Sequence, residues 1–157
     1  VLDGIHRNIT MVIVNFSFDG TGEVLYFVRW PIKWKNYIKS VAAYKNLQKQ
    51  YPLLKLNCWT TVSSLNVENL PSILDFVTEQ GLDHNWAFLN DPDALNVKYK
   101  NKFTVRAKKK LSKSSYSVCR DIAKKIAVDQ DNSKLLEYFI KRQDTLRSIS
   151  IDDYFNF

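Results

Sequence analysis

The sequence predicts an α/β fold in which parallel strands are joined by crossover helices. Residues 12–22 open with an apolar run and then alternate between Phe16 and Phe18 on one side and Ser17 and Asp19 on the other. This period of two is typical of a strand. Strand-like and helix-like segments then follow each other in turn, as in βαβ units. Polar residues gather at the carboxyl end of each strand-like segment, where α/β proteins hold their ligands.

The composition indicates one folded core, because 45% of the 157 residues are hydrophobic and 13% are aromatic. Cys58 and Cys119 fall in apolar patterns, so we expect two buried, reduced thiols. No apolar run is long enough to span a bilayer and no signal peptide is visible, so we expect a cytoplasmic protein that does not bind a membrane. Because the chain starts at Val1 and leads directly into a structured pattern, we expect a piece of a longer protein.

After the first strand, the pattern predicts a second extended segment and then a helix. Residues 23–30 are rich in β-branched and aromatic side chains, which favour extension. Pro31 suits the first turn of a helix. Apolar residues recur at helical spacing from Trp34 to the end of this helix at Tyr51, which precedes a proline.

Two more strands and a helix complete the predicted α/β region, which spans residues 1–97. Residues 53–63 and residues 83–90 are the strands, and the second of them ends before an Asp-Pro pair. The helix between them is expected to follow Asn69, a candidate cap, and to end at Gly81.

Residues 98–157 are predicted to form a basic segment followed by amphipathic helices. Residues 95–105 look mixed and extended, and residues 106–113 are a basic run. Apolar residues at helical spacing predict helices over 116–128 and 133–147. The aromatic residues of the tail are expected to dock on the fold.

Candidate ligand-binding groups follow the first two strands along the chain. Because parallel strands end at one edge of a sheet, their terminal hydroxyl, amide and carboxylate groups should lie together and suit a polar ligand. An arginine placed close behind them could bind a carboxylate in a bidentate manner. The candidate site residues are Ser17, Asp19, Arg29, Thr61, Ser63 and Asn66.

A structural interpretation of the same residues stays open. Asp19 precedes a glycine and can serve turn chemistry alone, and Arg29 can be a surface ion-pair partner. Neither His6 nor His84 has a Ser or Cys elbow nearby, and the glycine pattern matches no P-loop. No Cys-x-x-Cys spacing exists, so local cysteines build no zinc site. The sequence therefore offers candidate binding residues and no evident catalytic triad.

Several motifs, taken in order, resemble the radical S-adenosylmethionine superfamily, in particular its members with a SPASM or twitch C-terminal region. Residues 17–20 and 26–34 resemble its S-[IL]-D-G and YIR-[YH]-P-x-K-W segments. Residues 57–71 are similar to its T-V-S-x-x-N run with the L-P helix start, and residues 85–97 to its sixth-strand region. The tail, residues 147–155, is similar to its closing helix and the aromatic segment after it.

The resemblance implies a partial TIM-like (βα)6 barrel with these strands as its fourth to sixth. In that family a [4Fe–4S] cluster cleaves S-adenosylmethionine reductively, and the resulting 5′-deoxyadenosyl radical abstracts a hydrogen from the substrate, which here could be a peptide or RNA. By analogy, Ser17 and Asp19 would contact the ribose and amino-acid part of the cofactor, and Arg29 its carboxylate. The residues expected beside the adenosine are Thr61, Ser63 and Asn66.

The chain departs from the family in one respect, because the Cys-x-x-x-Cys-x-x-Cys loop after the family's first strand has no counterpart here. We therefore expect this chain to act only when joined to a cluster-binding half, or to be a degenerate relative. A first alternative is a non-catalytic α/β domain that binds an anionic partner such as RNA through residues 98–113. This alternative rests on the formal net charge of +7 of the chain, although charge alone identifies no partner. A second alternative is a remnant without a site.

Overall fold

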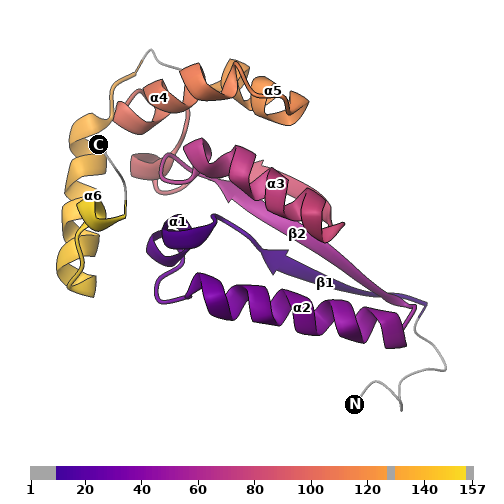
Figure 1. Cartoon of the computed structure of the whole chain (residues 1–157). Helices are drawn as coiled ribbons and strands as arrows, with labels where there is room; N and C mark the ends of the chain where they lie inside the picture. Colours follow the sequence, from indigo (N-terminus) through magenta and orange to yellow (C-terminus); the bar gives the residue numbers. More distant parts are fainter. Residues whose placement is uncertain (1–9, 127–129, 155–157) are drawn as a thin grey trace.

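The computed structural model describes residues 10–126 and 130–154 (Figure 1). Three strands form one open sheet in the order β1–β2–β3, and both pairs are parallel, as predicted. The strands are β1 (Val12–Ser17), β2 (Leu54–Val62) and β3 (Asp83–Phe88). The crossover helices are α2 (Trp34–Gln50) between β1 and β2 and α3 (Leu70–Gln80) between β2 and β3. The mixed α/β class with parallel strands is thus confirmed.

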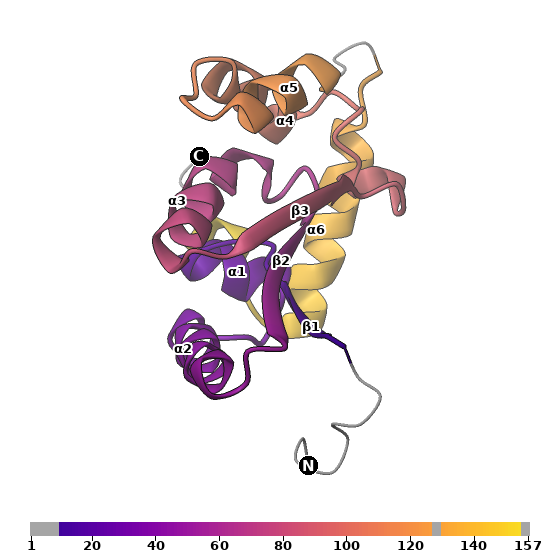
Figure 2. The ribbon, with the colours of Figure 1, turned by 90° about the vertical axis from the view of Figure 1, so that its right-hand side faces the viewer.

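Helices cover one face of the sheet, and α2 and α3 lie on the same side of it (Figure 2). In β2, Leu56 and Cys58 are buried on this covered face, whereas Lys55 and Trp59 point to the opposite face and are exposed. Ile13 in β1 is also exposed, at 52%. We call the second face the bare face. Successive side chains of a strand point to opposite faces of the sheet, so the alternation in the sequence places apolar residues on the covered face.

The prediction of an extended segment over residues 23–30 is wrong, because Gly22–Val28 form the helix α1. Phe27 is buried in a core group against which Val24 and Val28 pack. In a helix, residues three and four positions apart share a face, so these three side chains reach the same group. A strand would send Val24 and Phe27 to opposite sides. Packing overrides the local preference for extension here.

The helix α3 ends as predicted at Gly81, which has a φ of +60° and donates its backbone N–H to the carbonyls of Val77 and Thr78. Asn69 precedes the helix, but its side chain makes no cap. Its Oδ1 instead accepts from the backbone N of Thr21 at 2.7 Å and from the Thr21 hydroxyl at 3.1 Å. The loop that follows β1 is thereby tied to the start of α3.

The C-terminal part contains α4 (Lys102–Leu111), α5 (Ser117–Lys125) and α6 (Ser133–Arg147). The extended prediction for residues 95–105 is wrong from Lys102 onward, because the Asn101 side chain starts α4 by accepting from the backbone N of Phe103 and Thr104 at 3.0 Å each. The helix predicted over 133–147 is confirmed. The helix predicted over 116–128 is found as α5, and its last two predicted residues lie outside the described part of the chain.

The tail docks as predicted, up to residue 154. Tyr154 stacks on Tyr26 with 5.5 Å between ring centroids and lies 5.6 Å from the Phe27 ring. Ile151 is buried in the same core group as Phe27. The aromatic residues 155–157 lie outside the described residues.

Two buried groups hold the molecule together. The larger lies between the covered face and helices α2 to α5, and it includes Cys58 and Cys119, which are free and buried as expected. Burial raises the pKa of the Cys58 thiol to about 11. The smaller group joins α1 to α4 and α6 through Phe27, Phe103 and Leu136. Each of the two buried groups contains residues from the predicted α/β region, 1–97, and from the C-terminal region, 98–157. In the described ranges, no helix is long and apolar enough to cross a membrane.

Candidate functional site

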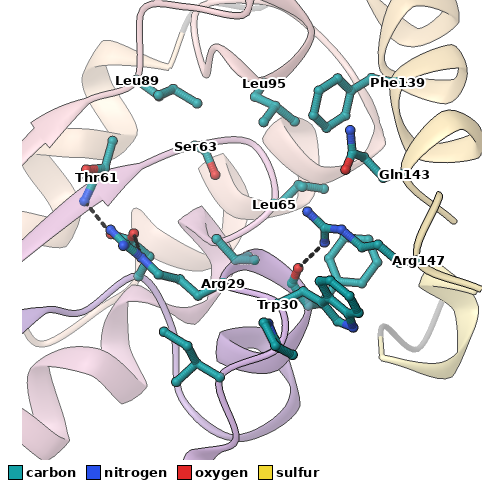
Figure 3. Close-up of a pocket in the computed structure, with 15 residues that line it drawn as sticks. Arg29, Trp30, Thr61, Ser63, Leu65, Leu89, Leu95, Phe139, Gln143 and Arg147 are labelled. Atoms are coloured by element: carbon teal, nitrogen blue, oxygen red, sulfur yellow. Dashed lines mark hydrogen bonds and ion pairs between the residues drawn. The ribbon is translucent and has the colours of Figure 1, made fainter. Parts of the chain in front are cut away.

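A cavity of about 670 Å³ opens beyond the carboxyl ends of β1 and β2 (Figure 3). In Figure 1 these strand ends point toward α1 and α6. Asp19, Thr61 and Ser63 contribute the strand side of the wall, and Arg29 and Trp30 come from the end of α1 and the turn after it. The cavity lies where parallel sheets hold ligands, and where the sequence pattern places the candidate site.

The carboxylate of Asp19 connects the elements that form the strand side of the cavity wall. Its Oδ2 accepts from Arg29 Nε at 2.6 Å, and its Oδ1 accepts from the backbone N of Thr61 at 2.7 Å. Its side chain is 7% exposed, against 35% for Arg29. One carboxylate therefore joins the loop after β1, the end of α1 and strand β2, and it orients the Arg29 guanidinium along the cavity wall.

Gly20 allows this arrangement, because the first turns of α1 pass close to its Cα. A Cβ atom at position 20 would lie 2.8 Å from the backbone N of Leu25 and 3.0 Å from a side-chain carbon of Val24. A larger residue would push α1 away from the strand end. The turn interpretation expects Asp19 to bond nearby backbone amides, but its Oδ1 accepts from Thr61, 42 positions away in the sequence. Asp19 and Gly20 together hold α1 close to the end of β1 and so position the cavity wall.

Asn66 holds the turn that follows β2 and lies outside the lining. Its Oδ1 accepts from the backbone N of Ser63 at 2.7 Å and from the Ser63 hydroxyl at 3.3 Å, and its Nδ2 donates to the Thr61 carbonyl at 2.8 Å. Asn66 is fully buried, at 0% exposure. Its amide therefore sets the positions of Ser63 and Thr61, which do line the cavity.

Ser17 lies apart from the cavity, on the bare face at the end of β1. Its carbonyl accepts from the Tyr37 hydroxyl at 3.2 Å. The structure thus brings four of the six candidate residues to one cavity: Asp19, Arg29, Thr61 and Ser63.

The opposite wall comes from α6, which the sequence reasoning did not connect with the site. Phe139, Gln143 and Arg147 line the cavity at positions four residues apart, on one face of the helix (Figure 3). Arg147 Nη1 donates to the Phe27 carbonyl at 2.6 Å, and its guanidinium lies 5.7 Å from the Phe27 ring centroid. Burial lowers the pKa of this guanidinium from its usual value. The i, i+4, i+8 spacing was a sequence signal, although nothing local indicated which element this face would meet.

The lining suits a small ligand that carries a carboxylate or phosphate group. Its ionisable groups are two guanidiniums, Arg29 and Arg147, and one carboxylate, Asp19, which gives a formal charge of +1. Hydroxyl groups of Thr61 and Ser63 and the indole of Trp30 stand beside them. Guanidinium groups recognise carboxylate and phosphate oxygens, and an exposed ring suits a flat apolar group. The arrangement is one for binding and orienting a ligand.

No group of three or more His, Cys, Asp or Glu side chains lies close enough to hold a metal ion within residues 10–126 and 130–154. Cys58 and Cys119 are both buried. Burial raises the pKa of both thiols, which disfavours the thiolate form that iron ligation needs. The donor set on these residues does not fit a [4Fe–4S] cluster.

The basic run does not form one continuous surface. Arg106 pairs with the Glu68 side chain, and Lys110 Nζ donates to the Glu68 carbonyl at 3.0 Å. Lys108 Nζ donates to the Ile126 carbonyl at 2.9 Å. Helical geometry therefore turns neighbouring basic side chains in different directions. RNA binding through residues 98–113 stays a prediction.

Comparisons of this chain with protein-family models, with curated proteins and with solved structures found no match. The comparisons therefore place the chain in no family.

Proposed function

We propose that this chain forms the S-adenosylmethionine-binding part of a radical S-adenosylmethionine enzyme, with the ligand in the cavity of Figure 3. One observation carries the proposal. Four of the six residues that the resemblance assigned to cofactor binding line a single cavity at the carboxyl ends of parallel strands. Turn chemistry alone would not require Arg29, Thr61 and Ser63 to share a cavity.

The bare face of the sheet supports the barrel that the resemblance implies. Parallel sheets are normally covered on both faces, yet helices cover only one face here. In a barrel, strands from the other half cover the inner face. The bare face carries an amide ladder in which Asn85 Nδ2 donates to Asn57 Oδ1 at 3.0 Å and Asn57 Nδ2 donates to Asn15 Oδ1 at 2.6 Å. One half of a (βα)6 barrel would present such a surface.

The lining offers contacts to three parts of S-adenosylmethionine: its carboxylate, its ribose and its adenine. Arg29 would bind its carboxylate, since Asp19 already holds Nε and orients the guanidinium. Thr61 and Ser63 would donate to or accept from ribose hydroxyls. Trp30 would pack on the adenine ring. Asp19 and Asn66 would act as positioning residues, because their side-chain oxygens bind other protein groups.

The proposal covers ligand binding and no chemical step. The described residues do not fit the cluster that cleaves S-adenosylmethionine in such enzymes. A cluster would have to be held by residues other than these.

Calorimetric titration of this chain with S-adenosylmethionine and with its decarboxylated analogue tests the proposal. The chain should bind S-adenosylmethionine, and Arg29→Gln should weaken this binding about tenfold, because a charge-assisted contact to the carboxylate is lost. The same substitution should leave affinity for the decarboxylated analogue nearly unchanged. Arg142, which is exposed and lies outside the lining, gives the matched control Arg142→Gln.

The two ligands together separate recognition from a loss of folding, because a misfolded variant loses affinity for both. The proposal fails if the chain binds neither ligand, or if Arg29→Gln weakens both equally while the circular dichroism spectrum is unchanged.

A further inference from the structure

A second concave surface lies between α4 and α5, away from the cavity at the strand ends. We call it the α4–α5 groove. It has a volume of about 500 Å³, and its walls include Val105, Lys108 and Lys109 from α4 and Arg120, Ala123 and Lys124 from α5. In both Figure 1 and Figure 2 these two helices form the outermost layer of the molecule, beyond α3.

The rim of the groove is positively charged. Four of its lining residues are Lys or Arg, and no lining residue is acidic. Two of them are held in place by backbone carbonyls: Lys108 Nζ donates to Ile126 O at 2.9 Å, and Arg120 Nη1 donates to Ser114 O at 2.7 Å. Lys124 pairs with the exposed Asp121 at 2.9 Å. Because Lys108 and Arg120 are already held in place, binding an anionic partner immobilises fewer rim side chains and costs less conformational entropy.

The floor of the groove is apolar. Val105 is 44% exposed although it stands in the middle of α4, and the buried Ala123 lies across from it. The long methylene stems of the lysines extend this surface. No aromatic ring is among the lining residues, so the groove offers no platform for stacking a nucleotide base. An apolar floor inside a basic rim complements a chain segment with apolar side chains flanked by carboxylates.

We propose that the α4–α5 groove binds an acidic amphipathic helix of a partner protein. Its apolar stripe contacts Val105, and its flanking carboxylates pair with Lys109 and Lys124. This mode is the insertion of a helix into a groove, with charges on the rim setting specificity and association rate. The groove and the cavity at the strand ends share no lining residue.

Fluorescence anisotropy with three labelled probes tests the proposal. The first probe is a synthetic peptide of Leu and Glu with Leu at i, i+3, i+4 and i+7. The second has the same composition with the Leu positions scrambled, and the third is an oligouridylate. The first peptide should bind tighter than the scrambled one by about tenfold, since only it presents a continuous apolar stripe. The oligouridylate should bind more weakly than the first peptide.

Two variants with matched controls locate the site. Lys109→Glu should weaken binding of the first peptide about tenfold through charge repulsion at the rim. Lys134→Glu makes the same charge change at an exposed position of α6 and should leave binding unchanged. Val105→Asp should abolish the preference for the striped peptide over the scrambled one, while circular dichroism confirms that the helices are intact.

Three results would overturn the proposal: equal affinity for the striped and scrambled peptides, equal weakening by Lys109→Glu and Lys134→Glu, or tighter binding of the oligouridylate than of the striped peptide. The last result would assign the groove to nucleic acid. None of these results bears on the titration with S-adenosylmethionine, so the two proposals fail separately.

Discussion

The same three strands supply two faces with different chemistry. On the covered face, Phe16, Leu56 and Cys58 are buried against helices. On the bare face, Ile13 is 52% and Trp59 is 43% exposed, and asparagines bind one another across the strands. The covered face stabilises the fold. The bare face contributes little burial to this chain and leaves large apolar side chains exposed.

The largest expected difference between the faces is in stability. Leu56→Ala removes a side chain that is 4% exposed and leaves a cavity, so it should lower the free energy of unfolding by about 2–5 kcal/mol. Ile13→Ala on the bare face should change it by less than about 0.5 kcal/mol. Urea unfolding followed by circular dichroism measures both. Equal losses would mean that the bare face is covered in solution.

A smaller effect is expected at Asp19, where the strand ends meet the cavity. Asp19→Ala leaves the Thr61 N–H and the Arg29 guanidinium without their acceptor and should cost about 1–3 kcal/mol. Asp19→Asn should cost less, because an amide oxygen can still accept from Thr61. Asp83→Ala, an exposed carboxylate at the start of β3, is the control and should cost less than about 0.5 kcal/mol. A loss at Asp83 as large as at Asp19 would contradict the bridging role of Asp19.

The smallest effect is a pH dependence on the covered face. Thr60 Oγ1 donates to the Phe18 carbonyl at 2.7 Å, so His84 Nε2, 2.9 Å away, is the donor to Thr60. Burial lowers the pKa of His84 below its usual 6.5. The unfolded chain therefore takes up a proton first as the pH falls, and stability should decline below about pH 6.5.

His84→Gln should remove this decline. Unfolding free energies at about pH 7.5 and about pH 5.5 check the prediction. If wild type and variant lose the same stability between these two values, His84 does not cause the decline.

Local patterns in the sequence were sufficient to predict the three strands and most of the helices. Alternation over β2 and the helical spacing of α6 each reflect one buried side, which is a local property. The residues of α1 were misassigned because their side chains favour extension. Phe27 reaches its core partners only in a helix, and those partners come from Leu65, Phe103 and Leu136, far away in the sequence.

The strand side of the cavity could be predicted for a similar reason. Asp19, Thr61 and Ser63 lie at or just beyond the carboxyl ends of parallel strands, and topology alone brings such positions together. Gln143 and Arg147 come from a helix outside the sheet, and periodicity does not specify where such a helix docks. Asn66 was predicted to contact a ligand because amides suit polar ligands, yet its amide binds the backbone of its own turn.

The hydrogen bond from Arg147 to the Phe27 carbonyl joins residues 120 positions apart. This bond holds α6 against α1. The cavity is closed on the α6 side only while α6 is docked. Detachment of α6 and opening of the cavity are therefore one local unfolding equilibrium. A ligand that fills the cavity should therefore slow amide hydrogen exchange in α6, and the protection of α6 should report on occupancy of a site whose lining comes mostly from residues 19–95.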